Sequence, residues 1–192
     1  RLELMPSTAG GVARFIGRES MVGSQVLDDL KSSTEWPKTI SVLHPTPQPE
    51  KGEPHGAATL VHSADGQRSD LRIQWAVFLP TSDETEIKID LAPGQGRFTL
   101  LLHGYFFLDS GRRRIEAIDD VGDPARERQL RQRWNIELRD QVTLPLIPRL
   151  LEDALGAKVI DTAQLATLVG ALQTSPWFAD HQDAVCKTDQ LV

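Results

Sequence analysis

Apolar and polar residues alternate along much of the middle of this chain, with a period of two. Residues 71–79 and 85–91 both show this pattern, and each segment places its apolar side chains on one face. These apolar positions are Leu71, Ile73, Trp75, Val77 and Leu79 in the first segment and Ile87, Ile89 and Leu91 in the second. Such alternation is typical of antiparallel strands that bury one face. Residues 57–62 are a further candidate strand.

Residues 98–108, FTLLLHGYFFL, are apolar at most positions. A run of this kind predicts a central strand that is covered on both faces, or nearly so. Gly104 lies inside the run, where a glycine indicates a bulge or a close approach of the backbone. The GQG at 94–96 lies between two predicted strands, and we interpret it as a hairpin turn.

The apolar period then changes to 3.6, which predicts helices. Asp123 followed by Pro124 is typical of an N-cap and a first helical position, so we predict a helix over 124–141. Its apolar residues recur every fourth position and are Leu130, Trp134, Leu138 and Val142. A second helix is expected after Thr143, with Gly156 as its terminator.

A third helix is predicted to begin at Asp161. Its apolar stripe consists of Leu165, Leu168, Val169 and Leu172. Near the other end of the chain, a helix is predicted over 19–31, because four apolar residues there share one side of a helical wheel. They are Met21, Val22, Val26 and Leu30. Residues 45–56 are rich in Pro, Gly and charge and are expected to form a loop.

This order of elements predicts an α+β fold, with a mainly antiparallel sheet and helices on one face. Residues 1–56 are expected to lead into the domain as a helix and a flexible loop region. Residues 57–156 would form the α+β domain, and residues 157–192 a C-terminal helical segment. The chain has 192 residues, of which 40% are hydrophobic, so a substantial core is possible.

Charge and cysteine content narrow the possible partners and the compartment. The net charge of -6 argues against a dedicated nucleic-acid surface. Cys186 is the one cysteine, so no internal disulfide can form, and a cytoplasmic, reducing home is the simplest interpretation. No stretch approaches the ~18–20 apolar residues of a membrane span. The first residue is Arg1 rather than Met, so we expect the chain to be part of a longer protein.

The candidate chemistry lies in HGYFFLDSGRRRI, residues 103–115. An apolar strand leads directly into a turn, formed by Asp109, Ser110 and Gly111, that presents three consecutive arginines. The planar guanidinium group matches phosphate oxygens well, because it donates two parallel hydrogen bonds. The alternative is an exposed basic turn that pairs with nearby acidic residues, which is how short charge runs commonly behave.

Four segments resemble the region that follows the nucleotide-binding domain in sacsin-like proteins and heat-shock-protein-ninety chaperones, which are split-type (GHKL) ATPases. The segments are FLP at 78–80, LLLHGYFFLDSGRRRI at 100–115, WNIEL at 134–138 and LPLIPRLLEDAL at 144–155. The resemblance implies the middle, or transducer, domain of such an ATPase, with a chaperone or remodelling role. It also implies a fold like the second domain of ribosomal protein S-five.

In that family, the corresponding turn supplies an arginine that contacts the γ-phosphate of ATP. By resemblance, this catalytic and cofactor-contacting role falls on Arg112 or Arg113, and Ser110 joins them in contacting the cofactor. The ATP and its Mg²⁺ would be held mainly by a preceding nucleotide-binding domain, since this chain contains neither a D-x-G-x-G motif nor a phosphate-binding loop. The isolated chain is therefore not expected to hold a cofactor or to be catalytic alone.

Two other functions remain open at this point. The chain could be a non-catalytic interaction module that binds client or partner proteins. It could also be the transducer domain of a DNA-processing ATPase, although such proteins use a lysine near the γ-phosphate. A metal site is not expected, because His55 and His62 lack a tight ligand spacing. Membrane binding is not expected either.

Overall fold

The computed structural model describes residues 13–21, 25–33, 54–64, 68–77, 79–81, 86–111, 113–121 and 129–186. Its strands are β1 (Ala13–Met21), β2 (His55–Ser63), β3 (Asp70–Val77), β4 (Leu79–Pro80), β5 (Ile87–Asp90) and β6 (Arg97–Gly104). Its helices are α1 (Gln25–Lys31), α2 (Leu130–Leu138), the π-helical turn η2 (Arg139–Thr143), α3 (Leu146–Gly156), α4 (Thr162–Thr174), α5 (Pro176–Asp180) and α6 (Gln182–Val185). The chain is thus α+β.

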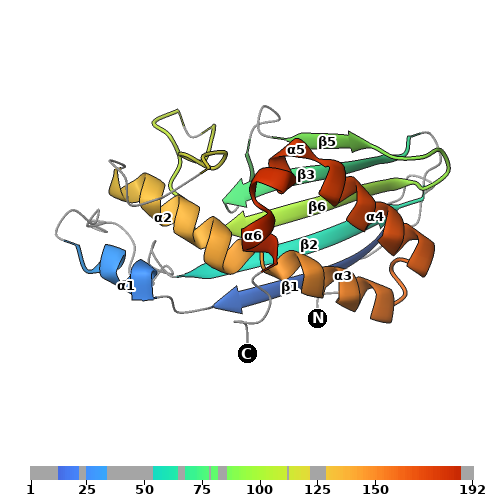
Figure 1. Cartoon of the computed structure of the whole chain (residues 1–192), viewed down its shortest axis with the longest axis horizontal. Coiled ribbons are helices and arrows are strands. Elements are labelled where there is room, and N and C mark those ends of the chain that lie inside the picture. The colour runs from blue at the N-terminus through green and yellow to red at the C-terminus, as the bar shows by residue number, and fades with distance from the viewer. Residues whose placement is uncertain are drawn as a thin grey trace.

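The strands form one mixed sheet in the order β1-β2-β6-β3-β4, and β5 pairs with β3. The pairs β1–β2, β2–β6, β3–β4 and β3–β5 are antiparallel, whereas β3 and β6 run parallel. Figure 1 shows α2, α3 and α4 lying across one face of this sheet. The expected layer of helices on a sheet is therefore present, and the sheet is mixed.

The first strand corrects one sequence prediction. Residues 13–21 form β1, which pairs with β2 from Ala13↔Ser63 to Met21↔His55, so the N-terminal part of the predicted helix over 19–31 is wrong. Only Gln25–Lys31 is helical, and it buries Leu27 and Leu30 while Val26 is exposed. Pairing along the whole length of a neighbouring strand outweighs a weak helical stripe, because propensity is easily overridden by tertiary contacts.

The middle strands agree closely with the alternation in the sequence. The first of these strands, β3, buries Leu71, Ile73 and Trp75 against the helices, as predicted. The prediction of a central strand is confirmed by β6, which lies between β2 and β3. It ends at Gly104 and alternates between buried and half-buried positions rather than being buried on both faces.

The GQG segment is not a hairpin turn, because β5 and β6 do not pair with each other. Both pair with β3, so the connection at 91–96 passes over the end of β3 and is held there by a hydrogen bond of 2.9 Å from the Leu91 N–H to the Ser69 carbonyl. Gly96 adopts a φ of +78°, and a Cβ on it would lie 2.7 Å from the carbonyl oxygen of Ser63. Only glycine fits this close crossing.

The helices begin and end near their predicted limits, with one exception. The proposed cap Asp123-Pro124 lies outside the described residues, and α2 begins at Leu130 after an extended Gln129. The helix α3 ends at Gly156 as expected. Asp161 caps α4 through a reciprocal pair of hydrogen bonds with Gln164, of 2.8 and 3.0 Å. The helices α5 and α6 lie within the predicted C-terminal helical segment, although their individual bounds were not predicted.

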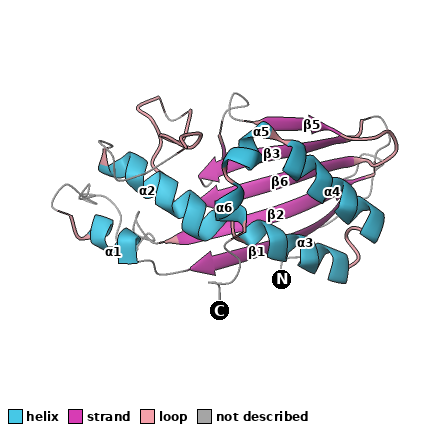
Figure 2. Ribbon diagram, viewed as in Figure 1, coloured by secondary structure: helices cyan, strands magenta, loops and turns pink. Residues whose placement is uncertain are grey.

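One hydrophobic core joins the sheet to the helices. Figure 2 shows the helices stacked as a single layer on the strands. The largest buried side chains of this core include Trp75 and Phe98 from the sheet and Trp134 from α2, all at most 1% exposed. This core takes residues from α1, from the strands and from the C-terminal helices alike. No described helix has the length and apolar character needed to cross a membrane.

Candidate functional site

Residues 107–111 and 113–116 form a small hairpin that follows β6, with Arg113 and Arg114 close to its turn. We call residues 107–116 the arginine hairpin. Its two legs are joined by a bridge between Leu108 and Ile115 and by hydrogen bonds from Asp109 N–H to the Arg114 carbonyl (2.9 Å) and from Glu116 N–H to the Phe107 carbonyl (3.1 Å). The predicted continuation of the central strand to residue 108 is therefore wrong, since the chain leaves the sheet after Gly104.

Asp109 shapes the tip of the arginine hairpin. Its carboxylate Oδ1 accepts hydrogen bonds from the backbone N–H groups of Arg113 (2.8 Å) and Arg114 (3.3 Å). A short acidic side chain that bonds to backbone groups a few residues on is a common way to close a turn. Because the carboxylate is used on the backbone, the turn is held in shape without depending on the guanidinium groups.

The base of the arginine hairpin is held by α2. Asn135 is 0% exposed, and its side-chain Oδ1 accepts a hydrogen bond from Phe107 N–H (2.7 Å). Its Nδ2 donates to the carbonyls of Phe107 (2.8 Å) and Glu116 (2.9 Å), one on each leg. The preceding Trp134 donates its indole N–H to the Tyr105 carbonyl (3.0 Å). Two consecutive helical residues therefore fix the start of the hairpin to the rigid core.

The segment after the hairpin is held by a buried arginine. We call residues 116–120 the return turn. Arg139, only 2% exposed, donates from Nη1 to the carbonyls of Ile118 (2.6 Å) and Asp120 (2.9 Å). Its Nε and Nη2 donate to the two carboxylate oxygens of Asp140, at 2.6 and 3.0 Å. The bidentate ion pair compensates the buried charge, which would otherwise be very costly.

The C-terminal helix α5 also contacts the return turn. Trp177 donates its indole N–H to Asp119 (2.9 Å), and its ring stacks on His181 with the centroids 3.9 Å apart. The His181 Nδ1 lies 2.6 Å from the Trp177 carbonyl. Burial lowers the pKa of His181, and the charge of Arg139 lowers it further, while the hydrogen bond to the Trp177 carbonyl partly opposes both. This histidine is therefore neutral near pH 7.

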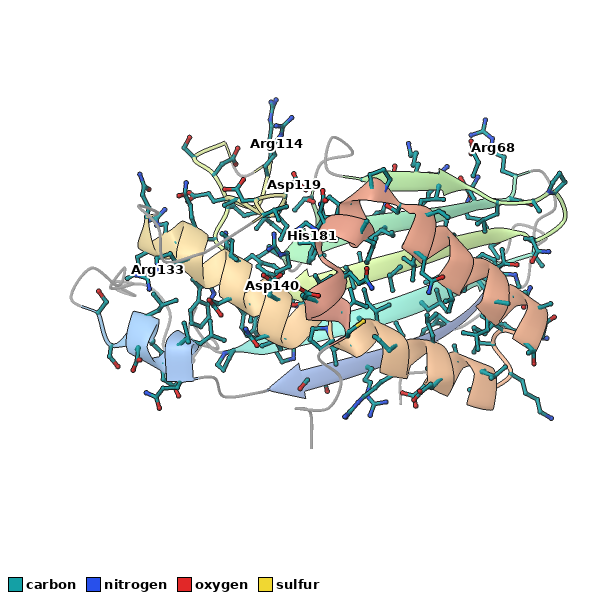
Figure 3. All side chains as sticks on the ribbon, viewed as in Figure 1. Arg68, Arg114, Asp119, Arg133, Asp140 and His181 are labelled. Carbon is teal, nitrogen blue, oxygen red and sulfur yellow. The ribbon has the colours of Figure 1, made fainter. Side chains whose placement is uncertain are left out.

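Two of the three predicted site residues lie at the exposed tip of this framework. Arg113 and Ser110 are exposed, and Arg112 lies outside the described residues. Figure 3 shows the neighbouring Arg114 directed away from the sheet and the helices. The tip is positively charged, and Arg131 on α2 adds a cation whose guanidinium carbon lies 5.6 Å from the centre of the Phe107 ring. An exposed, basic and firmly held turn can bind an anion supplied from outside the chain.

Sequence reasoning missed the residues that hold the arginine hairpin. Asn135 and Arg139 were not singled out, and Trp134 was assigned to the core, where it is indeed 0% exposed. The available signal was a short polar side chain between Trp134 and Ile136 in a helix that the apolar period places against the core. A buried amide must find hydrogen-bond partners, which marks such a position as structural or functional.

The histidines of the sheet do not assemble a metal site. Among the described residues, no group of three or more His, Cys, Asp or Glu side chains could hold a metal ion. His62 stacks on Phe98 with the ring centroids 4.4 Å apart, whereas His55 lies close to His103 and Tyr105. These two histidines of β2 are seven residues apart and face opposite sides of the sheet.

Comparison with known proteins gives no further assignment. No protein-family model, curated protein or solved structure matches this chain.

Proposed function

We propose that this chain is the middle, coupling domain of a multidomain split-type ATPase of the sacsin-like and heat-shock-protein-ninety-like kind, with a chaperone or remodelling role. In this proposal, a preceding domain binds ATP and Mg²⁺, and the arginine hairpin contacts the γ-phosphate when the two domains close. The finer fold, a mainly antiparallel sheet like the second domain of ribosomal protein S-five, is part of the same proposal.

The observation that supports this proposal best is the way in which the arginine hairpin is held. Exposed charged turns are commonly mobile and solvated, and little in the fold holds them in place. Here the base of the hairpin is bonded to buried Asn135, and its tip is closed by Asp109. A group that must meet one phosphate oxygen in a transition state needs such rigid support.

The resemblance in sequence supports the same function. The quoted WNIEL segment supplies Trp134 and Asn135, which contact the strand end and the arginine hairpin. The LPLIPRLLEDAL segment contains α3, whose apolar residues pack on the sheet. One quoted segment therefore contacts the arginine hairpin directly, and the other packs on the sheet from which the hairpin leaves.

The experiment that tests the proposal measures ATP turnover by the protein that carries this chain together with its nucleotide-binding domain. Replacing Arg112 and Arg113 together by alanine should reduce turnover by about 10³-fold or more, as for other arginine fingers, with folding intact by circular dichroism. Arg68→Ala, an exposed arginine far from the hairpin (Figure 3), is the matched control and should leave turnover unchanged. Unchanged turnover in the double variant would exclude the γ-phosphate role.

A protein-interaction module is the second candidate, and one feature favours it. An apolar groove of about 450 Å³ lies among α3, α4, α5 and α6, and it is lined by residues such as Leu151, Leu172 and Phe178. If replacing Arg112 and Arg113 leaves turnover unchanged, this groove is the surface to test first for partner binding. Replacing Val169, which is 37% exposed at the groove, by aspartate should then abolish partner binding while leaving the fold intact.

A further inference from the structure

Asn135 makes three side-chain hydrogen bonds, and all three go to the arginine hairpin. Its Oδ1 accepts one hydrogen bond, and its Nδ2 donates two, at 2.7, 2.8 and 2.9 Å. A carboxamide has two N–H donors, so both are spent on the two legs of the hairpin. The side chain acts on Phe107 as a neighbouring strand would, because it bonds both the N–H and the carbonyl of that residue.

The hairpin needs this support because its own pairing is short. Among the residues that the structure describes, one bridge and two backbone hydrogen bonds join the legs, and an isolated two-stranded ribbon is at best marginally stable in water. Tip geometry is set locally by Asp109, but Asp109 lies within the hairpin and moves with it. The direction in which the tip points is therefore set at the base, where α2 holds it.

We propose that Asn135 is the positioning residue of the arginine hairpin: its three hydrogen bonds fix where Arg113 and Arg114 stand relative to the core, and ATP turnover depends on the placement of this hairpin. This inference rests on the proposed function. Asn135 is 0% exposed, so its side chain is closed to a nucleotide from outside the chain and acts through the hairpin. A displacement of about 1 Å in a positioned catalytic group can reduce turnover by about 10²-fold.

The position calls for two variants and one control. Asn135→Ala removes all three hydrogen bonds, so the Phe107 N–H and the Glu116 carbonyl lose their bonds to α2, and the Phe107 carbonyl keeps the bond from the Glu116 N–H. Asn135→Ser is smaller than asparagine but still polar, and it serves if the alanine variant fails to fold. Leu168→Ala is the control, because Leu168 is buried in α4 and belongs to the same core without bonding to the hairpin.

Two readouts separate positioning from general loss of stability. The first is amide hydrogen exchange in this chain, which should become faster across residues 107–116 in the Asn135 variants while β2 and β6 keep their protection. The second is turnover by the protein with its nucleotide-binding domain, where kcat should fall about 10- to 100-fold and KM for ATP should stay within about twofold. Leu168→Ala should lower the melting temperature, with hairpin exchange and kcat close to those of the original protein.

The outcomes are distinct. Unchanged exchange in the hairpin overturns this inference, and so does a fall in kcat no larger than that of the Leu168→Ala control. If exchange becomes faster but turnover is unchanged by substitution of Asn135, Arg112 and Arg113, the proposed function is overturned. The dependence of turnover on hairpin placement is then overturned as well. Faster exchange together with lower kcat at constant KM supports the assignment.

Discussion

The indole N–H of Trp177 donates a hydrogen bond of 2.9 Å to the carboxylate of Asp119, which lies 58 residues earlier in the chain. The contact joins α5 to the return turn, in which the Ile118 and Asp120 carbonyls accept hydrogen bonds from Arg139. The arginine hairpin therefore leads into the return turn, which is held both by Arg139 of η2 and by Trp177 of α5.

We expect this bond to be measurable by a double-mutant cycle. Trp177→Phe removes the N–H but keeps an aromatic ring, and Asp119→Ala removes the acceptor, so each should lower the free energy of unfolding by about 1 kcal/mol. The double variant should lose clearly less than the sum, because both single changes remove the same bond. Urea unfolding measures all four proteins, and Asp119→Asn, which retains an acceptor oxygen, is the control. Strict additivity would show that the two residues do not interact.

The buried histidines predict a loss of stability in mild acid. Burial lowers the pKa of His103, and the nearby charge of His55 lowers it further; burial is also the main cause of the lowered pKa of His181. In the unfolded chain both groups titrate near 6.5, so the unfolded state binds more protons as the pH falls below that value. The stability they contribute is thus present above about pH 6.5 and is lost as the pH falls towards the lowered values of the folded state.

Urea unfolding at a series of pH values between 7.5 and 5 checks this expectation. His181→Gln should flatten the dependence, since glutamine does not titrate. A stability that does not change with pH in this window would contradict the expected effect of burial.

Gly104 offers a test of packing at the end of β6. A Cβ on this residue would lie 2.7 Å from the ring of Phe106, which confirms the close approach predicted from the sequence. Gly104→Ala should therefore reduce the free energy of unfolding by about 1–3 kcal/mol, as overpacking does. Gly170→Ala is the matched control: it lies in α4 with no atom within 4 Å of the added Cβ, and it should stabilise the protein by about 0.5–1 kcal/mol. Thermal and urea unfolding distinguish the two signs.

The strands and the long helices could be predicted because their buried faces repeat with a clear period. Residues 71–75 alternate between apolar and polar positions, and burial alternates in step with them. Residues 130–142 have an apolar residue at every fourth position, of which Trp134, Leu138 and Val142 are buried. The β1 strand was missed because its partner, β2, lies more than thirty residues further along the chain. Alternation in ARFIGRESM is weak, since neither face of this edge strand is fully buried.

The candidate site was predictable in part. The turn chemistry of Asp109 and the run of arginines are local, and the sequence indicated both. The support from Asn135 and Arg139 is not local, because the carbonyls that they bond belong to residues about 20 to 30 positions earlier, and backbone carbonyls carry no signature in the sequence. A polar residue in an apolar period shows that a partner is needed without showing which one.

The π-helical turn η2 has a consequence for how this chain can vary in length. Between α2 and α3 the backbone stays helical but takes one wide turn over Arg139–Thr143, a form that is rare in proteins and frequent at functional sites. A π turn holds about one residue more than an α turn, so the loss of one residue there would tighten the turn and leave the buried face of α3, with Leu150 and Ala154, on the sheet. The gain of one residue would instead rotate α3 by about 100° and shift it by about 1.5 Å. We therefore expect this segment to tolerate a deletion of one residue better than an insertion.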